Sequence, residues 1–337
     1  MQKTRSGMGY IFAGYSDPMM RTIFKDCLKQ ENVSILREIL PFSTYVNGLF
    51  RGLFMRFYKY QFCQILFYII EKIYHPLEKI NTDYEKVYIL FTNGASIGIS
   101  VHYLKNYLKH HKNCIPVMLF MDQMDKYWSE YAKYLVNHIS QFRCFTFDPE
   151  DARDTGYKHT MNIYSCQDAP TGGISADIYF SFLGKDRLDL VRDITEYLEL
   201  GKIKCNIIYV GHIGKDENKL GSVKNVEKRM QYPDILKDVL QANCLLEVLR
   251  PEQTGVTLRY YEALCYNKKL LTNNKNIINL PFYNSQYMKV FEKPSDIDCQ
   301  WVRRREKVNY HYENEFSPVH FLEEIAGSET DDSSRNI

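Results

Sequence analysis

Residues 247–274 read EVLRPEQTGVTLRYYEALCYNKKLLTNN, and this stretch contains the unit from which the fold is predicted. An apolar run at 244–249 fits a buried strand, and a polar turn with Pro251 and Gly255 follows it. A helical pattern comes next, and the short apolar run 269–272 fits a second strand. A strand, a turn, a helix and a strand in this order are typical of a parallel α/β sheet.

The turn at the start of this helix has the chemistry of an anion site. Free backbone N–H groups and the positive end of the helix dipole point at such a turn. Its cationic, hydroxyl and amide groups, with one glycine between them, are Arg250, Gln253, Thr254, Gly255 and Thr257. Glu262 follows one helical turn later, where a carboxylate suits ribose hydroxyls. The stretch therefore predicts a nucleotide diphosphate site. The alternatives are an ordinary polar turn and, for Glu262, a surface ion pair with Arg259.

Composition sets the class of protein. The 337 residues suffice for two domains, and 45% hydrophobic and 25% charged residues are ordinary for a globular chain. A net charge of +2 gives no reason to propose a nucleic-acid partner. The nine cysteines include no CxxC pair, which argues against a zinc site or a disulfide framework and favours a reducing compartment. With no signal-peptide pattern and no spanning segment, the sequence predicts a cytoplasmic protein.

The first 165 residues are predicted to form one domain. A strand is expected at 10–14, a helix at 20–40 and a long helix at 48–79. Regular alternation of strands and helices then begins. Strands are expected at 87–91, 115–121 and 142–147, and helices are expected from the turn 93–96 through His110 and at 125–139. Strands that are apolar throughout and alternate with helices predict a parallel sheet covered on both faces.

A polar segment with glycine and proline, residues 166–176, is predicted to be a linker. A second α/β domain is expected at 177–326, and the polar residues 327–337 are predicted to be a disordered tail. Within the second domain, strands are expected at 177–183 and 205–210, and helices at 186–200 and 232–242. The strand, turn, helix and strand of residues 244–272 follow them. Two such domains predict a cleft between them.

The pattern Gln-x-Gly-x-Thr-x-Arg-x-x-Glu-x-Leu at 253–264, followed by Lys-Lys-Leu at 268–270, resembles the donor-site segment of GT-B glycosyltransferases. It is most similar to the bacterial group that builds capsule, O-antigen and lipopolysaccharide sugars. Residues 147–152 with Tyr157, and residues 182–187, also resemble segments of that group. The resemblance covers residues from about 85 to 325.

The resemblance implies a hexosyltransferase-like enzyme with two Rossmann-like domains whose parallel sheets face each other across a cleft. The C-terminal domain would hold a nucleotide-sugar donor, and the acceptor would approach from the N-terminal domain. Glu262 stands at the family's ribose-binding glutamate, and 253–257 at its diphosphate-binding turn. Lys185 and Arg187 stand where basic groups reach the phosphates, and Gly184 precedes them in the predicted donor site. The alternative is that Lys185 and Arg187 cap the start of a helix or lie in solvent. The family's common Glu-Gly-Phe-Gly form of the turn is absent, so contacts to the donor sugar are not predicted.

Metal-independent catalysis is predicted, because fixed cations can stabilise the charge on a departing diphosphate. Asp296 and Asp298 form a DxD, but they follow Pro294 and Ser295 and are better explained as helix caps. No metal and no cofactor are predicted, since the nucleotide diphosphate sugar is the substrate.

Asp122 and Asp148, each after an apolar strand, are the candidates for a general base; the alternative is a turn or helix-start residue for each. The small-residue turn with Asn93, Gly94 and Ser96 is a candidate for the acceptor wall.

The basic, aromatic segment 48–79 is a candidate for peripheral contact with the inner membrane; the alternative is a helix packed on its own domain. The expected partners are a nucleotide-sugar donor and a glycan or lipid-linked glycan acceptor. The predicted function is transfer of a sugar to a hydroxyl of a cell-surface glycan precursor. The alternatives are a sugar-nucleotide 2-epimerase and a non-catalytic subunit that binds a nucleotide or polysaccharide.

Overall fold

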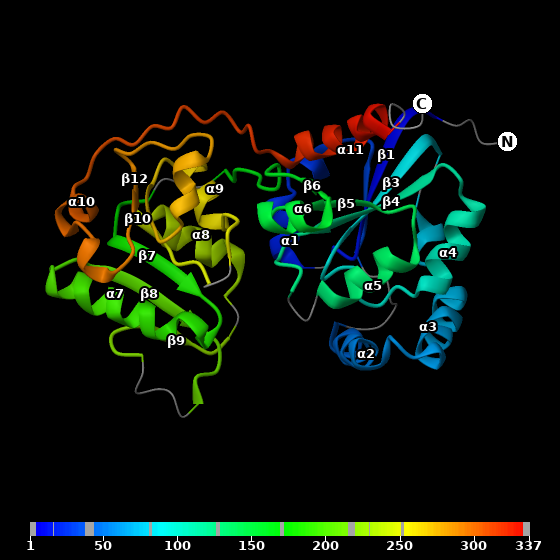
Figure 1. Cartoon of the computed structure of the whole chain (residues 1–337), viewed down its shortest axis with the longest axis horizontal. Coiled ribbons are helices and arrows are strands. Elements are labelled where there is room, and N and C mark those ends of the chain that lie inside the picture. Colours follow the sequence, from blue (N-terminus) through cyan, green and yellow to red (C-terminus); the bar gives the residue numbers. More distant parts are fainter. Residues whose placement is uncertain are drawn as a thin grey trace. The chain divides into compact units, whose positions relative to one another are not determined.

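The computed structural model describes residues 5–15, 17–37, 44–80, 83–125, 129–168, 172–214, 220–228, 230–250 and 253–332. The chain divides into two compact units. The first comprises Met1–Ser165 together with Ser317–Ile337, and the second comprises Cys166–Phe316. Each is built around its own parallel sheet (Figure 1).

The sheet of the first unit has six strands in the order β2-β1-β3-β4-β5-β6, and all neighbours are parallel. The strands are β1 Arg5–Ala13, β2 Val33–Leu36, β3 Tyr84–Thr92, β4 Cys114–Phe120, β5 Arg143–Thr146 and β6 Lys158–His159. The central strands are apolar on both sides because helices cover both faces of the sheet.

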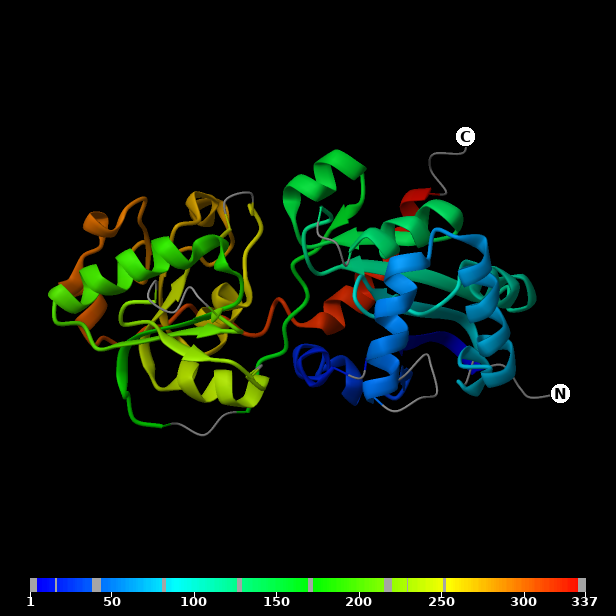
Figure 2. The ribbon, with the colours of Figure 1, turned by 90° about the horizontal axis from the view of Figure 1, so that it is seen from below.

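One face carries α2 Thr44–Phe57, α3 Gln61–Tyr74, α4 Val101–His110 and α5 Glu130–His138, whose buried residues form one core with β1 and β3. The other face carries α1 Pro18–Ile23 and α11 Pro318–Asp332, and α6 Pro149–Thr155 links β5 to β6. The ring centroids of Phe145 and Phe321 lie 5.1 Å apart, and the Tyr10 hydroxyl donates to the Leu322 carbonyl at 3.1 Å. The C-terminal helix therefore belongs to the first unit (Figure 2).

Three expectations for these segments were wrong. The helix predicted at 20–40 is α1, a 3-10 turn at Cys27–Lys29 and β2, because the run Val33–Leu36 pairs with β1. The helix predicted at 48–79 breaks into α2 and α3, since Tyr60 adopts an extended backbone. The tail predicted at 327–337 continues α11 to Asp332, and residues 333–337 lie outside the described residues. The boundary expected at 326 thus falls inside α11.

The sheet of the second unit has six parallel strands in the order β12-β11-β10-β7-β8-β9. The strands are β7 Ala176–Phe182, β8 Cys205–Val210, β9 Lys224–Val226, β10 Ala242–Glu247, β11 Lys269–Thr272 and β12 Met288–Val290. Helices α7 Leu188–Leu200 and α10 Cys299–Arg303 share one core with the sheet, and α8 Tyr232–Leu240 and α9 Leu258–Cys265 lie on the opposite face. This strand order is that of the dinucleotide-binding Rossmann fold. The predicted α/β class with two Rossmann-like parallel sheets is confirmed.

A disulfide joins Cys166 to Cys265, with their Cα atoms 5.6 Å apart. The sequence argued against a disulfide framework and did not predict this single bond, because a separation of 99 residues says nothing about distance in the fold. The other seven cysteines are free.

In the part of the chain that the structure describes, no helix has both the length and the apolar character needed to cross a bilayer.

Candidate functional site

The second sheet has a topological switch point between β7 and β10, its two central strands. Connections leave these strands in opposite directions, and in open α/β sheets ligands bind in the crevice outside the carboxyl ends at such a point. The residues that follow β7 are 183–187, and those that follow β10 are 248–257. The structure thus brings both predicted donor segments to one edge of one sheet; Pro251 lies outside the described residues.

Arg187 ties the two turns together. Its guanidinium donates to the carbonyl of Val248 at 2.5 Å and to that of Leu183 at 3.1 Å. It also lies 5.6 Å from the ring centroids of Phe180 and Phe182. Its Nε is buried and has no hydrogen-bond partner. Burial, together with the nearby Arg250 cation, lowers the pKa of Arg187 to about 10. One donor of a rigidly held cation is therefore unused at the switch point.

Two more cations surround this position. Arg250, whose side chain is 24% exposed, forms an ion pair with Asp186, its Nε 3.4 Å from the carboxylate. The exposed Lys185 donates its Nζ to the carbonyl of Ile213 at 2.8 Å. Gly184 has φ 91°, and a Cβ there would lie 2.5 Å from the Asp186 carboxylate. Its role is therefore conformational, since it lets the turn bring Asp186 next to Arg250.

Thr257 is the N-cap of α9, and a buried carboxyl group holds it in place. Its backbone N–H and its hydroxyl donate to the same oxygen of Glu247, at 2.9 and 2.7 Å. The other oxygen of Glu247 accepts from the Thr272 hydroxyl at 2.6 Å. Burial raises the pKa of Glu247, against the opposing effect of these hydrogen bonds. The only signal for Glu247 in the sequence is that a glutamate ends an apolar strand, and no role was predicted for it.

The remaining residues of the predicted turn lie between these groups. Gln253 and Thr254 are half-buried and Gly255 is buried. The backbone N–H of Gln253 donates to the carbonyl of Arg250 at 3.1 Å, which closes the turn.

Glu262 faces the interior of the second unit. Its side chain is 0% exposed and forms an ion pair with Arg259, which is 9% exposed. Its other oxygen accepts from the Tyr232 hydroxyl at 2.8 Å. Arg259 also donates to Ser181 at 2.9 Å and lies 5.1 Å from the Tyr179 ring centroid. The alternative of a surface ion pair between Glu262 and Arg259 is wrong, because both side chains are buried. Both oxygens of Glu262 contact protein groups. This side chain joins α9 to α8, and its partner Arg259 contacts β7. The ribose contact of Glu262 stays a prediction.

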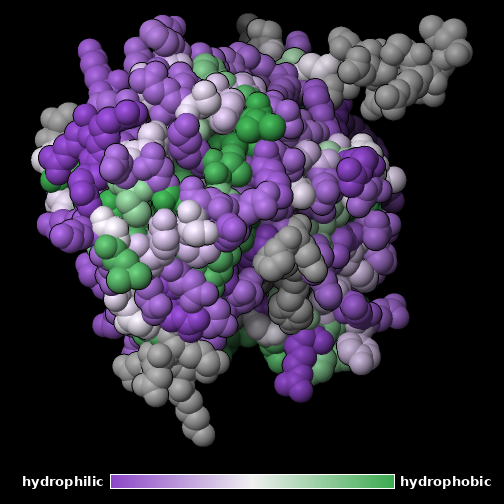
Figure 3. Space-filling view, turned by 60° about the vertical axis from the view of Figure 1, so that its left-hand side comes forward, coloured by the Kyte–Doolittle hydropathy of each residue, from purple (hydrophilic) through white to green (hydrophobic). Residues whose placement is uncertain are grey.

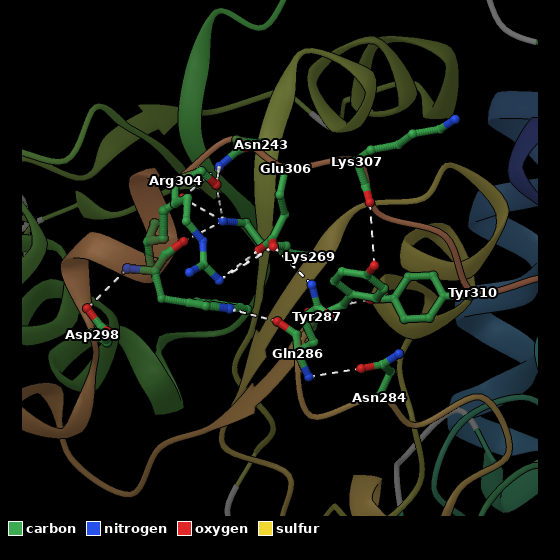
Figure 4. A network of polar contacts seen from close by, with 12 residues as sticks. Asn243, Lys269, Asn284, Gln286, Tyr287, Asp298, Arg304, Glu306, Lys307 and Tyr310 are labelled. Carbon is green, nitrogen blue, oxygen red and sulfur yellow. Dashed lines mark hydrogen bonds and ion pairs between the residues drawn. The ribbon is translucent and has the colours of Figure 1, made fainter.

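Lys268 and Lys269, the Lys-Lys pair of the motif, donate hydrogen bonds to backbone carbonyls at the amino edge of the sheet, opposite the predicted donor site. Lys268 donates to the carbonyls of Leu240 and Ala242 at 2.6 and 2.8 Å, where α8 ends, and burial lowers its pKa to about 8. Lys269 is buried and donates to the carbonyls of Trp301 and Arg304, as Figure 4 shows. These bonds hold the segment 301–304 against the start of β11.

The DxD residues are helix caps, as predicted. Asp296 accepts from the backbone N–H groups of Glu292 and Lys293 at 3.1 and 3.0 Å. Asp298 accepts from those of Gln300 and Trp301 at 2.8 and 3.0 Å, at the start of α10.

In the first unit, the turn 93–96 follows β3 at the switch point between β1 and β3. Asn93 donates to the Ser129 hydroxyl at 3.0 Å and accepts from the Met121 N–H at 3.3 Å. Ser96 is fully buried and donates to the Asn93 carbonyl at 2.8 Å. Only Gly94 of this turn is exposed. The side chains therefore brace the turn, and its role as an acceptor wall stays a prediction.

Asp148 is the N-cap of α6 and is 2% exposed. It accepts from the backbone N–H groups of Glu150 and Asp151 at 2.9 and 3.2 Å. The helix-start alternative therefore describes this residue. Asp122 is half-buried in the segment after β4, and its role as a base stays a prediction.

No family model matches the chain, and no curated protein matches it. Thirteen chains of known structure are similar to this chain, and two of them are the following. One structure is a mutant of TarM from S. aureus in complex with fondaparinux, alpha-GlcNAc-glycerol and UDP. Its TM-score is 0.45 at 11% identity, over 69% of this chain and 51% of that chain. The other is the glycotransferase of kitacinnamycin, with a TM-score of 0.41 at 10% identity, over 89% of both chains. The present chain therefore spans about half the length of the TarM chain.

Proposed function

We propose that this protein is a metal-independent glycosyltransferase of GT-B type that takes a sugar from a nucleotide diphosphate sugar. The observation that supports this best is the group of cations at the switch point of the second sheet. Lys185, Arg187 and Arg250 all lie at the carboxyl edge formed by β7 and β10, and the Nε of Arg187 has no acceptor. The proposed donor diphosphate occupies this edge.

The chemistry of glycosyl transfer fits such a group. The departing nucleotide diphosphate gains negative charge as the glycosidic bond breaks, and fixed donors stabilise it without reorganising during the reaction. Arg187 is held by two carbonyls and two aromatic rings, so its position is set before the ligand arrives. Arg250 has a half-exposed partner in Asp186, which a phosphate would replace.

The acceptor is proposed from the sequence resemblance alone. We propose a hydroxyl of a capsule, O-antigen or lipopolysaccharide precursor, with the acceptor approaching from the first unit. We also propose a cytoplasmic location, because seven of the nine cysteines are free. The Cys166–Cys265 bond opposes this location, since disulfides are rare in reducing compartments.

A thermal-shift screen with UDP-, GDP-, CMP- and dTDP-sugars tests the donor site. One nucleotide class should raise the melting temperature of the wild type, and Arg250→Ala should remove most of that shift. Lys204→Ala is the matched control, because it removes an exposed cation just before β8, at the opposite edge of the same sheet. A shift that survives Arg250→Ala but disappears in Lys204→Ala would refute the placement.

Turnover separates the proposal from its rivals. Incubation with the bound donor and candidate acceptors should release the nucleoside diphosphate. Change at the sugar C2 with the nucleotide retained would indicate a 2-epimerase. Binding with no release under any acceptor would indicate a non-catalytic subunit.

A further inference from the structure

The helical hairpin α2–α3 presents an unusual number of apolar side chains to solvent. Among the described residues, thirteen large apolar side chains are exposed, and nine of them belong to this hairpin. The nine are Leu49, Leu53, Tyr60, Phe62, Ile65, Leu66, Ile69, Ile73 and Tyr74. By contrast, on the face seen in Figure 3 hydrophilic residues predominate and apolar residues form small separate groups. Clustering of this kind marks an interaction surface, whereas scattered apolar residues do not.

The spacing on α3 places the apolar residues in one stripe. Phe62, Ile65, Leu66, Ile69 and Ile73 recur at intervals of three and four, so they share one side of the helix. Phe62 is 63% exposed and Ile73 is 74% exposed.

The opposite side of α3 carries its buried residues, Cys63, Gln64, Phe67 and Glu71, which pack on the first unit. The stripe is therefore not the side of α3 that serves the core of its own unit.

Apart from the buried Glu71, the charged residues of the hairpin are of one sign. Arg51, Arg56, Lys59 and Lys72 are its cations, and residues 44–70 contain no Asp or Glu. Glu71 is buried, where both of its oxygens accept hydrogen bonds from Ser100.

Aromatic rings lie beside three of these cations. Arg56 lies 5.5 Å from the Phe57 ring, Lys59 lies 5.6 Å from the Tyr58 ring, and Lys72 lies 5.6 Å from the Tyr68 ring. Lys59 also lies 3.9 Å from Glu130. Cations next to aromatic and aliphatic side chains are typical of helices that lie in the headgroup region of a membrane.

We propose that the α2–α3 hairpin docks the protein on an anionic phospholipid bilayer, with the α3 stripe in the acyl boundary and the cations at the phosphates. Each helix has 14 residues, or about 21 Å, which is shorter than the roughly 30 Å hydrocarbon core. The hairpin therefore lies in the interface and does not span. The absence of acidic residues over 44–70 favours an anionic surface over a second copy, because two copies would oppose their cations. This proposal does not depend on the proposed enzymatic activity.

Sedimentation with vesicles of phosphatidylcholine, with and without phosphatidylglycerol, tests the proposal. The wild type should bind the anionic vesicles, and binding should weaken as salt is raised. The triple variant Ile65→Gln/Ile69→Gln/Ile73→Gln should bind at least about tenfold more weakly, because three apolar side chains leave the acyl boundary. Arg56→Gln/Lys72→Gln should lose about fivefold per cation. Leu200→Gln/Ile278→Gln removes exposed apolar residues elsewhere and should bind like the wild type.

Several results would overturn the proposal. They are a wild type that does not sediment, a triple variant that sediments equally well, and a wild-type dimer in analytical ultracentrifugation that the triple variant abolishes. The last result would assign the stripe to a second copy. Ile73→Trp gives an independent reading in an otherwise intact chain: its fluorescence should shift to the blue with anionic vesicles, and an unchanged spectrum contradicts insertion.

Discussion

Replacement of Glu262 by alanine should destabilise the second unit strongly. The substitution leaves the 9%-exposed Arg259 guanidinium without its carboxylate and the Tyr232 hydroxyl without its acceptor. Removal of one partner of a buried ion pair costs about 3–5 kcal/mol. For a domain of this size, that free energy corresponds to a fall in melting temperature of about 6–20 °C.

Differential scanning calorimetry measures this directly, and the chain offers a matched control. Asp189 and Arg192 on α7 have the same three-residue spacing as Arg259 and Glu262, but Asp189 is 75% exposed. Asp189→Ala should leave the melting temperature nearly unchanged. A double variant, Arg259→Leu/Glu262→Leu, should recover most of the loss, because no unpaired charge remains in the core.

One result would refute this reasoning. If Glu262→Ala melts within about 1 °C of the wild type while the nucleotide-induced shift disappears, the carboxylate does not act as part of the scaffold. It would then serve as the ribose ligand that the sequence motif implies.

Three further substitutions test other parts of the structure. Burial raises the pKa of Glu71 from 4.5 to about 8, so the folded wild type holds a proton that the unfolded chain releases, and its free energy of unfolding should fall by a few kcal/mol as pH rises from 4.5 to 8. In Glu71→Gln the free energy of unfolding should change less with pH, as urea titrations at several pH values would show. Equal pH dependence in the two proteins would contradict this. Cys166→Ser should lower the urea midpoint, since the disulfide with Cys265 closes a long loop and can stabilise the fold by up to about 4–5 kcal/mol. A reductant should have no further effect on this variant, and a wild type whose mass shows two free thiols at these positions would refute the bond. Gly184→Ala should lower the free energy of unfolding by about 1–3 kcal/mol, because of the positive φ and the overlap of a Cβ with Asp186. Gly94→Ala, whose Cβ meets open space, should melt like the wild type. Similar losses of stability in the two variants would contradict the strain assigned to residue 184.

Periodicity predicted the inner strands of both sheets because buried parallel strands are continuous apolar runs. The short strands β6, β9 and β12, of two or three residues each, were not predicted, since so few residues show no period. The strands at 205–210 and 269–272 have the predicted bounds. The edge strand Val33–Leu36 was missed, since its four residues were included in the longer segment 20–40 that was predicted as helix, although Val33 and Ile35 favour a strand.

The site could be predicted only in part. Sequence order placed Arg187 and Arg250 after strands, and the strand order then made those strands neighbours. The direction of a side chain is set by packing, so the inward position of Glu262 could not be read from its spacing. For the same reason, the contact between Glu247 and Thr257 was not foreseen.

The central claim is that a diphosphate binds at the carboxyl edge formed by β7 and β10. A crystal structure with the nucleotide that gives the largest thermal shift tests it most directly. The diphosphate oxygens should lie within hydrogen-bond distance of the guanidinium groups of Arg250 and Arg187, with the Arg250–Asp186 pair broken. A diphosphate bound elsewhere, such as beside the turn 93–96 of the first unit, would contradict the claim.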